Sequence, residues 1–250
     1  MGQEGGGTWP PPWRRRIIID PGHGGHHKGG IGRIGSRTVY EKEVTIQVAV
    51  KLEKLIKADR RFDVRLTRRE DVYVGLKERT DRATAMKGDL FVSLHCNAVE
   101  AKGGRSSARG FEIWTWKQDA NLSTAGRAIE NLENDDPGTR TSENNKILTT
   151  MMKDALESNA LQSRRFASAM HDAAGGDTYL RTHDRGMDSA HFKVLEVYDM
   201  PSILVELGFM TNVDEVRMLF SDSFQQIWAQ TLYRGIVKYY EQTDPTFPRR

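Results

Sequence analysis

Short apolar runs that end in a polar residue alternate along this chain with stretches of helical spacing, and this alternation restricts the fold more than any other feature. The apolar runs cover residues 16–20, 62–68, 89–95, 110–116, 192–197 and 202–206. Helices are predicted over residues 43–57, 74–88, 164–173, 212–219 and 223–240. Strands that alternate with helices of this length are typical of α/β domains with a largely parallel sheet. We therefore predict one three-layer α/β domain, with a mostly parallel, twisted sheet of about six strands flanked by helices.

The chain has 250 residues, which suits one large domain. We assign residues 14–242 to this domain. Residues 1–13 are rich in Gly and Pro, and we interpret them as a linker or an added remnant, with residues 243–250 as a tail. Residues 117–165 interrupt the alternation because they carry helical patterns and no strand. They are therefore predicted to form a helical insertion.

Charge and composition argue against several classes of protein. The net charge of +3 comes from 37 basic and 34 acidic side chains, which gives no support for a nucleic-acid partner. No apolar run approaches the ~20 residues that a membrane-spanning helix needs. The single cysteine, Cys96, cannot form an intramolecular disulfide, so it does not distinguish the cytosol from the cell envelope.

Four side chains that can bind metals lie where a predicted strand ends or a helix begins. His23 follows the first strand on a Gly-rich turn, and Glu41 precedes the first long helix. His95 and Glu206 end two later strands. Because the carboxyl ends of parallel strands meet at one edge of a sheet, these residues could form a zinc site of two His and one Glu with a spare carboxylate. Taken singly, each also suits a plainer role as a turn residue, a helix-dipole charge or a solvated strand end.

Four blocks of sequence resemble, in content and order, the signatures of the zinc-dependent N-acetylmuramoyl-L-alanine amidases. The blocks are IIIDPGHGG, YEKEV, DLFVSLHCNA and MPSILVELGFMTN. The resemblance covers roughly residues 14–240 and is weakest between 117 and 165. It implies that His23, Glu41 and His95 bind one Zn²⁺ ion and that Glu206 is the catalytic residue.

The resemblance also implies a function. Members of this family hydrolyse the amide bond between N-acetylmuramic acid and L-alanine of the stem peptide in peptidoglycan. Zinc would polarise the carbonyl and activate water, and Glu206 would move the proton. This substrate would place the protein in the periplasm or the extracellular cell envelope, although no signal peptide is visible in the chain. Two other interpretations stay open, a zinc carboxypeptidase acting on peptides and an inactive cell-wall binding module.

Further residues near these blocks are candidates for other roles. Asn97 lies two positions after His95, and Arg185 lies in a segment that resembles a loop near the cleft of this family; both are candidates to bind substrate. His26 and His27 could be mistaken for metal ligands, but we do not assign them as such. Cys96 points away from His95 in strand geometry, which favours a thiol in the core.

The insertion over residues 117–165 has two interpretations. It could be packing structure alone. Some division-associated amidases of the resembling family instead carry a helix here that plugs the zinc cleft until an activator protein removes it. A stripe of Leu122, Ala125, Ile129 and Leu132 would let such a helix dock. Glu130 and Glu133 would then be candidates to fill the open position on the zinc.

Overall fold

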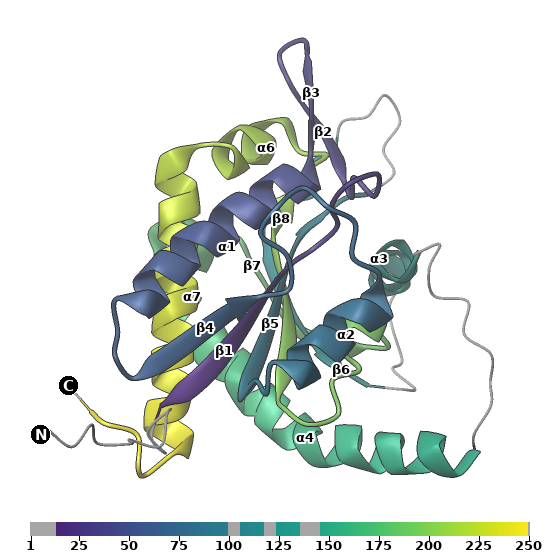
Figure 1. The fold of residues 1–250 in the computed structure, drawn as a ribbon. Helices are drawn as coiled ribbons and strands as arrows, with labels where there is room; N and C mark the ends of the chain where they lie inside the picture. The colour runs from purple at the N-terminus through teal and green to yellow at the C-terminus, as the bar shows by residue number, and fades with distance from the viewer. Residues whose placement is uncertain (1–13, 100–105, 118–123, 136–145, 250) are drawn as a thin grey trace, which may run out of the picture.

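The computed structural model describes residues 14–99, 106–117, 124–135 and 146–249. Its centre is a sheet of six strands in the order β4-β1-β5-β8-β6-β7, and a separate two-stranded hairpin, β2-β3, projects beyond it (Figure 1). The strands are β1 (Arg15–Pro21), β2 (Ile31–Ile34), β3 (Arg37–Tyr40), β4 (Phe62–Leu66), β5 (Leu90–Asn97), β6 (Phe111–Trp116), β7 (Asp184–Ala190) and β8 (Ser202–Phe209). The predicted linker at 1–13 lies outside the described residues.

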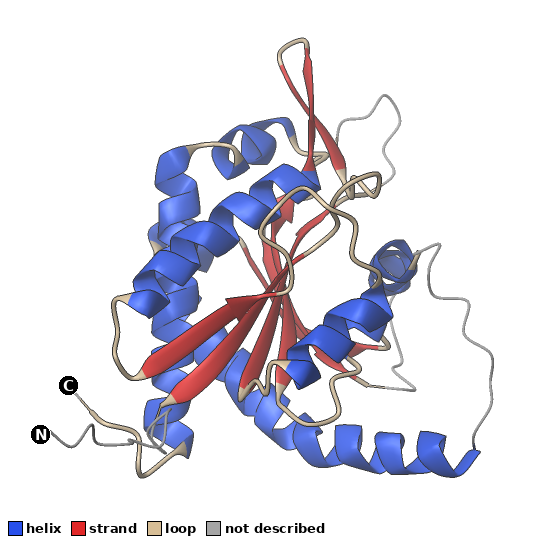
Figure 2. Ribbon diagram, viewed as in Figure 1, coloured by secondary structure: helices blue, strands red, loops and turns tan. Residues whose placement is uncertain are grey.

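Helices cover both faces of the sheet, which confirms the predicted three-layer architecture (Figure 2). The helices are α1 (Glu41–Lys57), α2 (Leu76–Ala85), α3 (Thr124–Asn134), α4 (Lys146–Ala174), α5 (Thr178–Thr182), α6 (Val213–Leu219) and α7 (Asp222–Thr243). One face packs against α1, α7 and the C-terminal half of α4. The other face packs against α2, α3 and the segment 190–200.

The apolar runs of the sequence are strands that are buried on both sides. In β1, Ile17 and Ile19 belong to the core beneath α1 and α7, whereas Ile18 belongs to the core on the α2 side. All three side chains are fully buried. Successive residues of a strand point to opposite faces, so a strand covered on both faces has a continuous apolar sequence.

The sheet is mostly parallel, as predicted. Strands β4, β1, β5 and β8 run in the same direction, and β6 and β7 run antiparallel to them. The register places His95 of β5 beside Glu206 of β8, and Glu206 beside Glu112 of β6. One edge of the sheet therefore collects polar side chains from consecutive strands.

Three predicted details were wrong. Residues 192–197 form no strand; a short 3-10 turn at Lys193–Leu195 packs against α2, and the run is apolar because it is buried there. The sixth strand is instead β7, an edge strand that is largely exposed and polar. The segment after the His23 turn, to which no strand was assigned, includes the hairpin β2-β3. The helix predicted over 164–173 begins earlier, inside the predicted insertion, as one continuous helix, α4.

The predicted tail packs against the domain. Phe247 is 3% exposed, and its ring contacts the rings of Phe62 and Tyr240. Arg61 donates a hydrogen bond to the carbonyl of Pro248. None of the helices in the described ranges combines the length and the apolar character that crossing a bilayer demands.

Candidate metal centre

Four buried side chains converge at the sheet edge, each offering one atom that can bind a metal. They come from the β1 turn, the first turn of α1, β5 and α3, and their ligand atoms all lie within 4.8 Å of one another: His23, Glu41, His95 and Glu133. Oε1 of Glu41 lies 2.9 Å from Nε2 of His23 and 3.2 Å from Nδ1 of His95. Oε2 of Glu133 lies 3.5 Å and 2.5 Å from the same two nitrogens.

This arrangement fits a metal ion. Two ligand atoms bound at about 2.1 Å to a tetrahedral zinc lie about 3.4 Å apart, close to most of the separations here. Nε2 of His23, Nδ1 of His95 and both oxygens of Glu133 are buried and form no hydrogen bond of good geometry. Buried polar atoms are almost always satisfied, so unsatisfied atoms that converge in this way are suited to share a cation. Neutral imidazole and carboxylate are the ligand types that zinc accepts.

Two backbone amides fix the carboxylate of Glu41. Its Oε1 accepts a hydrogen bond from the Cys96 amide, and its Oε2 accepts one from the Gly30 amide, both at 2.7 Å. Burial by itself raises the pKa of Glu41, but the neighbouring His23 and His95 outweigh burial and hold that pKa well below its ordinary range. Glu41 is therefore ionised at neutral pH, and backbone groups of β5 and of the turn before β2 hold its carboxylate in place.

The glycines around His23 leave room for the imidazoles. A Cβ atom on Gly22 would lie 2.6 Å from Nε2 of His95, and one on Gly29 would lie 2.5 Å from both Oε2 of Glu41 and Cδ2 of His23. His23 itself has a φ of 58°, a left-handed conformation that is unfavourable for a residue with a side chain. The surrounding structure must therefore hold this turn in place.

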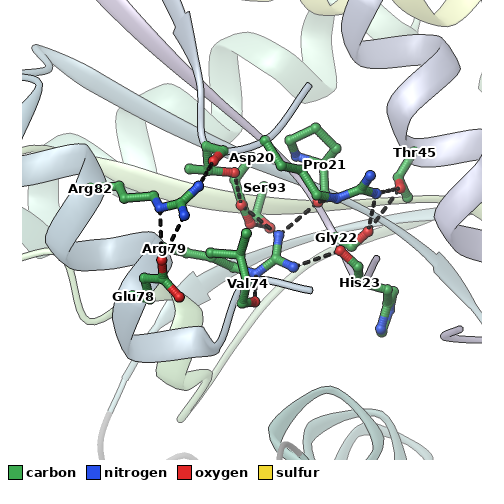
Figure 3. A network of polar contacts seen from close by, with 12 residues as sticks. Asp20, Pro21, Gly22, His23, Thr45, Val74, Glu78, Arg79, Arg82 and Ser93 are labelled. Carbon is green, nitrogen blue, oxygen red and sulfur yellow. Dashed lines mark hydrogen bonds and ion pairs between the residues drawn. The ribbon is translucent and has the colours of Figure 1, made fainter. Parts of the chain in front are cut away.

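Two buried arginines, Arg79 and Arg68, hold the His23 turn, and Figure 3 shows the contacts of Arg79. Arg79 of α2 donates hydrogen bonds to the carbonyls of Pro21 and His23 at 2.7 and 2.6 Å, and forms an ion pair with Asp20 at 2.8 Å. Arg68 donates to the carbonyls of Pro21 and Gly22 at 3.0 and 2.8 Å. Together these two guanidinium groups, which we call the arginine cradle, fix the backbone that carries His23.

The other two histidines of this segment lie outside the cluster of ligand atoms. Nδ1 of His27 lies 3.2 Å from Nδ1 of His23, the ring nitrogen that faces away from Glu41. A group of this kind orients a ligand imidazole and sets its tautomer. The ring of His26 lies 4.3 Å from the ring of Tyr73. The buried Cys96 thiol belongs to the core, as its strand position predicts.

Glu206 lies beside the cluster without joining it. It is fully buried, and neither carboxylate oxygen forms a hydrogen bond within the described structure. Burial raises the pKa of Glu206 well above its ordinary value, and the carboxylate of Glu133 raises it further. A carboxyl group with a raised pKa next to a metal site is suited to take up and release a proton.

Asn97 and Arg185 meet at a residue that the sequence analysis did not single out, Glu112. Nδ2 of Asn97 donates to Oε2 of Glu112 at 3.1 Å, and Nε of Arg185 donates to Oε1 of the same carboxylate. Glu112 stands directly opposite Glu206 in the β6-β8 pair. Its alternation with Phe111 and Ile113 in the sequence could have placed it on the face that carries the metal centre.

Helix α3 covers the cluster of ligand atoms. Of its two glutamates predicted as candidates for the open position on the zinc, one reaches the cluster. Glu133 is 2% exposed and reaches both histidines, whereas Glu130 accepts a hydrogen bond from the His191 amide at 2.7 Å and does not reach the cluster. Ile129 is buried as predicted, but Leu132 is 38% exposed. Ile129 and Glu133 are four residues apart and share a helix face, whereas Leu132 directly precedes Glu133 in sequence and points away from it. Leu122 lies outside the described residues.

The fold and the site together define an α/β protein with a buried His/Glu cluster, suited to hold a metal ion, at one edge of its sheet. Residues 17–238 match the N-acetylmuramoyl-L-alanine amidase family, and the chain belongs to this family. It is 32% identical over 227 residues to N-acetylmuramoyl-L-alanine amidase AmiC of Escherichia coli O6:H1, covering 90% of this chain and 52% of the relative. AmiC of Neisseria meningitidis serogroup B is also 32% identical, over 93% of this chain and 56% of the relative. The chain thus spans about half the length of these relatives.

Solved structures agree with this assignment. The N-acetylmuramoyl-L-alanine amidase of Clostridium difficile 630 superimposes with a TM-score of 0.68 and 26% identity, covering 93% of this chain and 99% of the other. The catalytic domain of CwlV, the amidase of Bacillus (Paenibacillus) polymyxa, gives a TM-score of 0.64 and 28% identity, covering 91% and 98%. The chain therefore has the architecture of an amidase catalytic domain.

Proposed function

We propose that this chain hydrolyses the amide bond between N-acetylmuramic acid and L-alanine of the peptidoglycan stem peptide. His23, Glu41 and His95 would hold one zinc ion, and Glu206 would be the catalytic residue. The observation that carries this proposal is the convergence of two imidazoles and a backbone-oriented carboxylate within reach of a second, unpaired carboxylate. A substrate of this kind lies in the cell envelope, so we place the active protein in the periplasm or outside the cell.

Each part of the mechanism falls to a named group. Zinc at this site would supply a Lewis acid that polarises the amide carbonyl and makes water acidic. Glu206 would take the proton from the attacking water and give it to the leaving amine of L-alanine. Glu41 would remain ionised throughout, since two amides and two imidazoles stabilise its charge. The arginine cradle would keep His23 in position without contacting substrate.

Product analysis tests this function against its alternatives. Purified peptidoglycan is incubated with the protein, with and without a chelator, and the released ends are identified by mass spectrometry. New N-terminal L-alanine that disappears with the chelator supports the amidase. A shortened stem peptide would indicate a zinc carboxypeptidase, and binding without products would indicate a cell-wall binding module.

We further propose that α3 inhibits this activity. Glu133 supplies a fourth ligand atom next to His95, and a zinc site with four protein ligands leaves no position for water. Three hydrogen bonds attach α3 to the segment after β7: Glu130 accepts from the His191 amide, and Asn134 accepts from the Lys193 amide and donates to the His191 carbonyl. A helix of 11 residues is marginal alone, so an activator protein could detach it at modest cost.

The inhibition is tested with Glu133→Ala, which removes the blocking carboxylate and leaves the helix sequence otherwise intact. Hydrolysis of peptidoglycan should rise several-fold while the affinity for zinc falls, because the same group is both ligand and plug. Arg127→Ala, an exposed change on the same helix, is the control and should alter neither. Deleting residues 120–136 should also raise activity. A fall in both activity and zinc affinity on Glu133→Ala would show that Glu133 serves the active enzyme.

A further inference from the structure

A row of polar side chains crosses the sheet edge beyond the metal centre. It begins with Asn97 on β5, passes Glu206 on β8 and Glu112 on β6, and ends with Arg185 on β7. Asn97 and Glu112 are 0% and 8% exposed. The buried Oδ1 of Asn97 forms no hydrogen bond within the described structure, so this row retains an acceptor that a ligand could use.

The guanidinium of Arg185 is held in place on one side only. Its Nε is bonded to Glu112, and its Cζ lies 5.1 Å from the centre of the Phe209 ring. Across the described ranges, no hydrogen bond or ion pair uses its two terminal Nη groups. The side chain is 37% exposed, so these groups face outwards. A guanidinium anchored through Nε still presents a pair of parallel donors, the geometry that binds a carboxylate with two hydrogen bonds.

The carboxylates of this row explain why the Arg185 side chain lies against it. Glu112 and Glu206 stand directly opposite each other on adjacent strands, where like charges are unfavourable. The ion pair with Arg185 offsets the charge of Glu112. Glu112 therefore fixes the guanidinium beside the proposed catalytic carboxylate.

We propose that Arg185 binds a free carboxylate on the stem peptide of the substrate, with Glu112 and Asn97 as its positioning residues. This inference rests on the proposed function. In that substrate the lactyl carboxyl is part of the scissile amide and the sugars are uncharged, so the free carboxylates belong to the stem peptide. The subsite would thus recognise a negative charge on the leaving peptide.

The spacing of the strands indicates which carboxylate is read. Neighbouring strands lie about 4.8 Å apart, so Glu112 on β6 is about 10 Å from the strand of His95. An extended peptide spans about 3.5 Å per residue. A group held beside Glu112 therefore lies within about three residues of a bond cleaved at the metal, and the acidic residue at the second position of the stem falls within this range.

Two matched substrates test the subsite: N-acetylmuramoyl-L-Ala-D-Glu, and the same compound with its free α-carboxylate converted to an amide. We measure kcat/KM for both in the Glu133→Ala background. The unaltered subsite should prefer the acid about tenfold, at the low end for a charge-assisted pair because Arg185 is partly exposed. Arg185→Gln should abolish this preference through slower turnover of the acid only. Arg181→Gln, an exposed change on the neighbouring helix α5, should retain it.

The ratio of the two substrates separates this inference from a general loss of structure. Glu112→Ala frees the guanidinium and should reduce the preference to a few-fold. An equal preference in the Arg185→Gln protein and its parent would overturn the subsite. If no variant cleaves either compound, the proposed function fails. Calorimetric binding of L-Ala-D-Glu against its amide then still decides whether Arg185 reads the carboxylate.

Discussion

Arg79 should stabilise both the fold and the metal centre, although it is not a ligand. Its guanidinium, 2% exposed, donates to the carbonyls of Val74, Pro21 and His23 and pairs with the buried carboxylate of Asp20 (Figure 3). Arg79→Met removes all of these contacts and leaves Asp20 with the hydroxyls of Thr67 and Ser93. We expect the variant to unfold more easily and to bind zinc more weakly.

The expected loss of stability follows from the charge that the substitution leaves without a partner. Removing one partner of a buried ion pair costs about 3–5 kcal/mol, because the remaining charge stays buried without compensation. With a urea m-value of about 3 kcal/mol/M, the unfolding midpoint should fall by about 1–1.7 M. Loss of a group that positions a ligand should lower zinc affinity by about 10- to 100-fold. Arg82→Met on the same helix removes an exposed pair with Glu78 and one hydrogen bond to the Thr67 carbonyl, and leaves no buried charge behind. It should therefore cost less, about 1–2 kcal/mol.

The difference in stability between Arg79→Met and the parent protein should depend on pH in a definite direction. Burial raises the pKa of Asp20, but Arg79 and hydrogen bonds from neighbouring side chains outweigh burial, and the net pKa is lowered. Without Arg79 only the hydroxyls of Thr67 and Ser93 oppose burial, and we expect the folded-state pKa of Asp20 to rise above the unfolded value. A carboxyl of that kind destabilises the fold at high pH, and the penalty disappears as pH falls through the folded pKa. The stability gap between the two proteins should therefore be largest at pH 7–8 and narrow towards pH 5.

Urea unfolding followed by circular dichroism in the presence of a chelator measures this gap without a contribution from zinc. Zinc affinity is measured separately, by competition with a chromogenic chelator. Equal midpoints for Arg79→Met and Arg82→Met would refute the role of the arginine cradle. A gap that is constant from pH 5 to pH 8 would show that the cost comes from lost packing and not from the charge of Asp20.

The metal centre yields three further predictions. His23→Ala and His95→Ala should each abolish stoichiometric zinc binding in metal analysis; full retention in either would remove that residue from the ligand set. Glu206→Gln should keep zinc but lower turnover by about 10²–10⁴, the usual cost of losing a general base, and near-normal turnover would make Glu206 structural. Gly29→Ala places a methyl group 2.5 Å from Oε2 of Glu41, so zinc affinity should fall while the fold persists; an unchanged affinity would show that the turn can shift.

The sequence predicted the parallel part of the sheet because those strands are buried on both faces. Such strands are continuous apolar runs, as in β1 and β5, and their ends can be located from the first polar residue. Strand β7 has no such signal, since it is an exposed edge strand whose pairing with β6 is determined by the rest of the fold. The run at 192–197 is apolar like a strand but does not form one. Burial alone makes a segment apolar, whatever its secondary structure.

The ligand cluster was partly predictable because its residues follow strand ends and match signature blocks. The residues that support it were not. Arg79 lies within a helix and Glu112 within a strand, and a charged residue is usually assigned to the surface in the absence of a partner. Their partners lie 56 and 73 residues away in sequence, at His23 and Arg185. Only the fold brings these groups together.

The electrostatics of the centre suggest that α3 would inhibit in two ways. Besides supplying a fourth ligand atom, Glu133 carries a negative charge that raises the pKa of Glu206 beyond the effect of burial. A protonated Glu206 cannot act as a base. Withdrawal of α3 would remove that negative neighbour, so the pKa of Glu206 should fall and more of it should be ionised at a given pH. The acid limb of the rate–pH profile should therefore lie at lower pH in Glu133→Ala than in the parent protein. An acid limb at the same pH in both would mean that Glu133 does not shift this pKa, and that α3 acts only by occupying the ligand position.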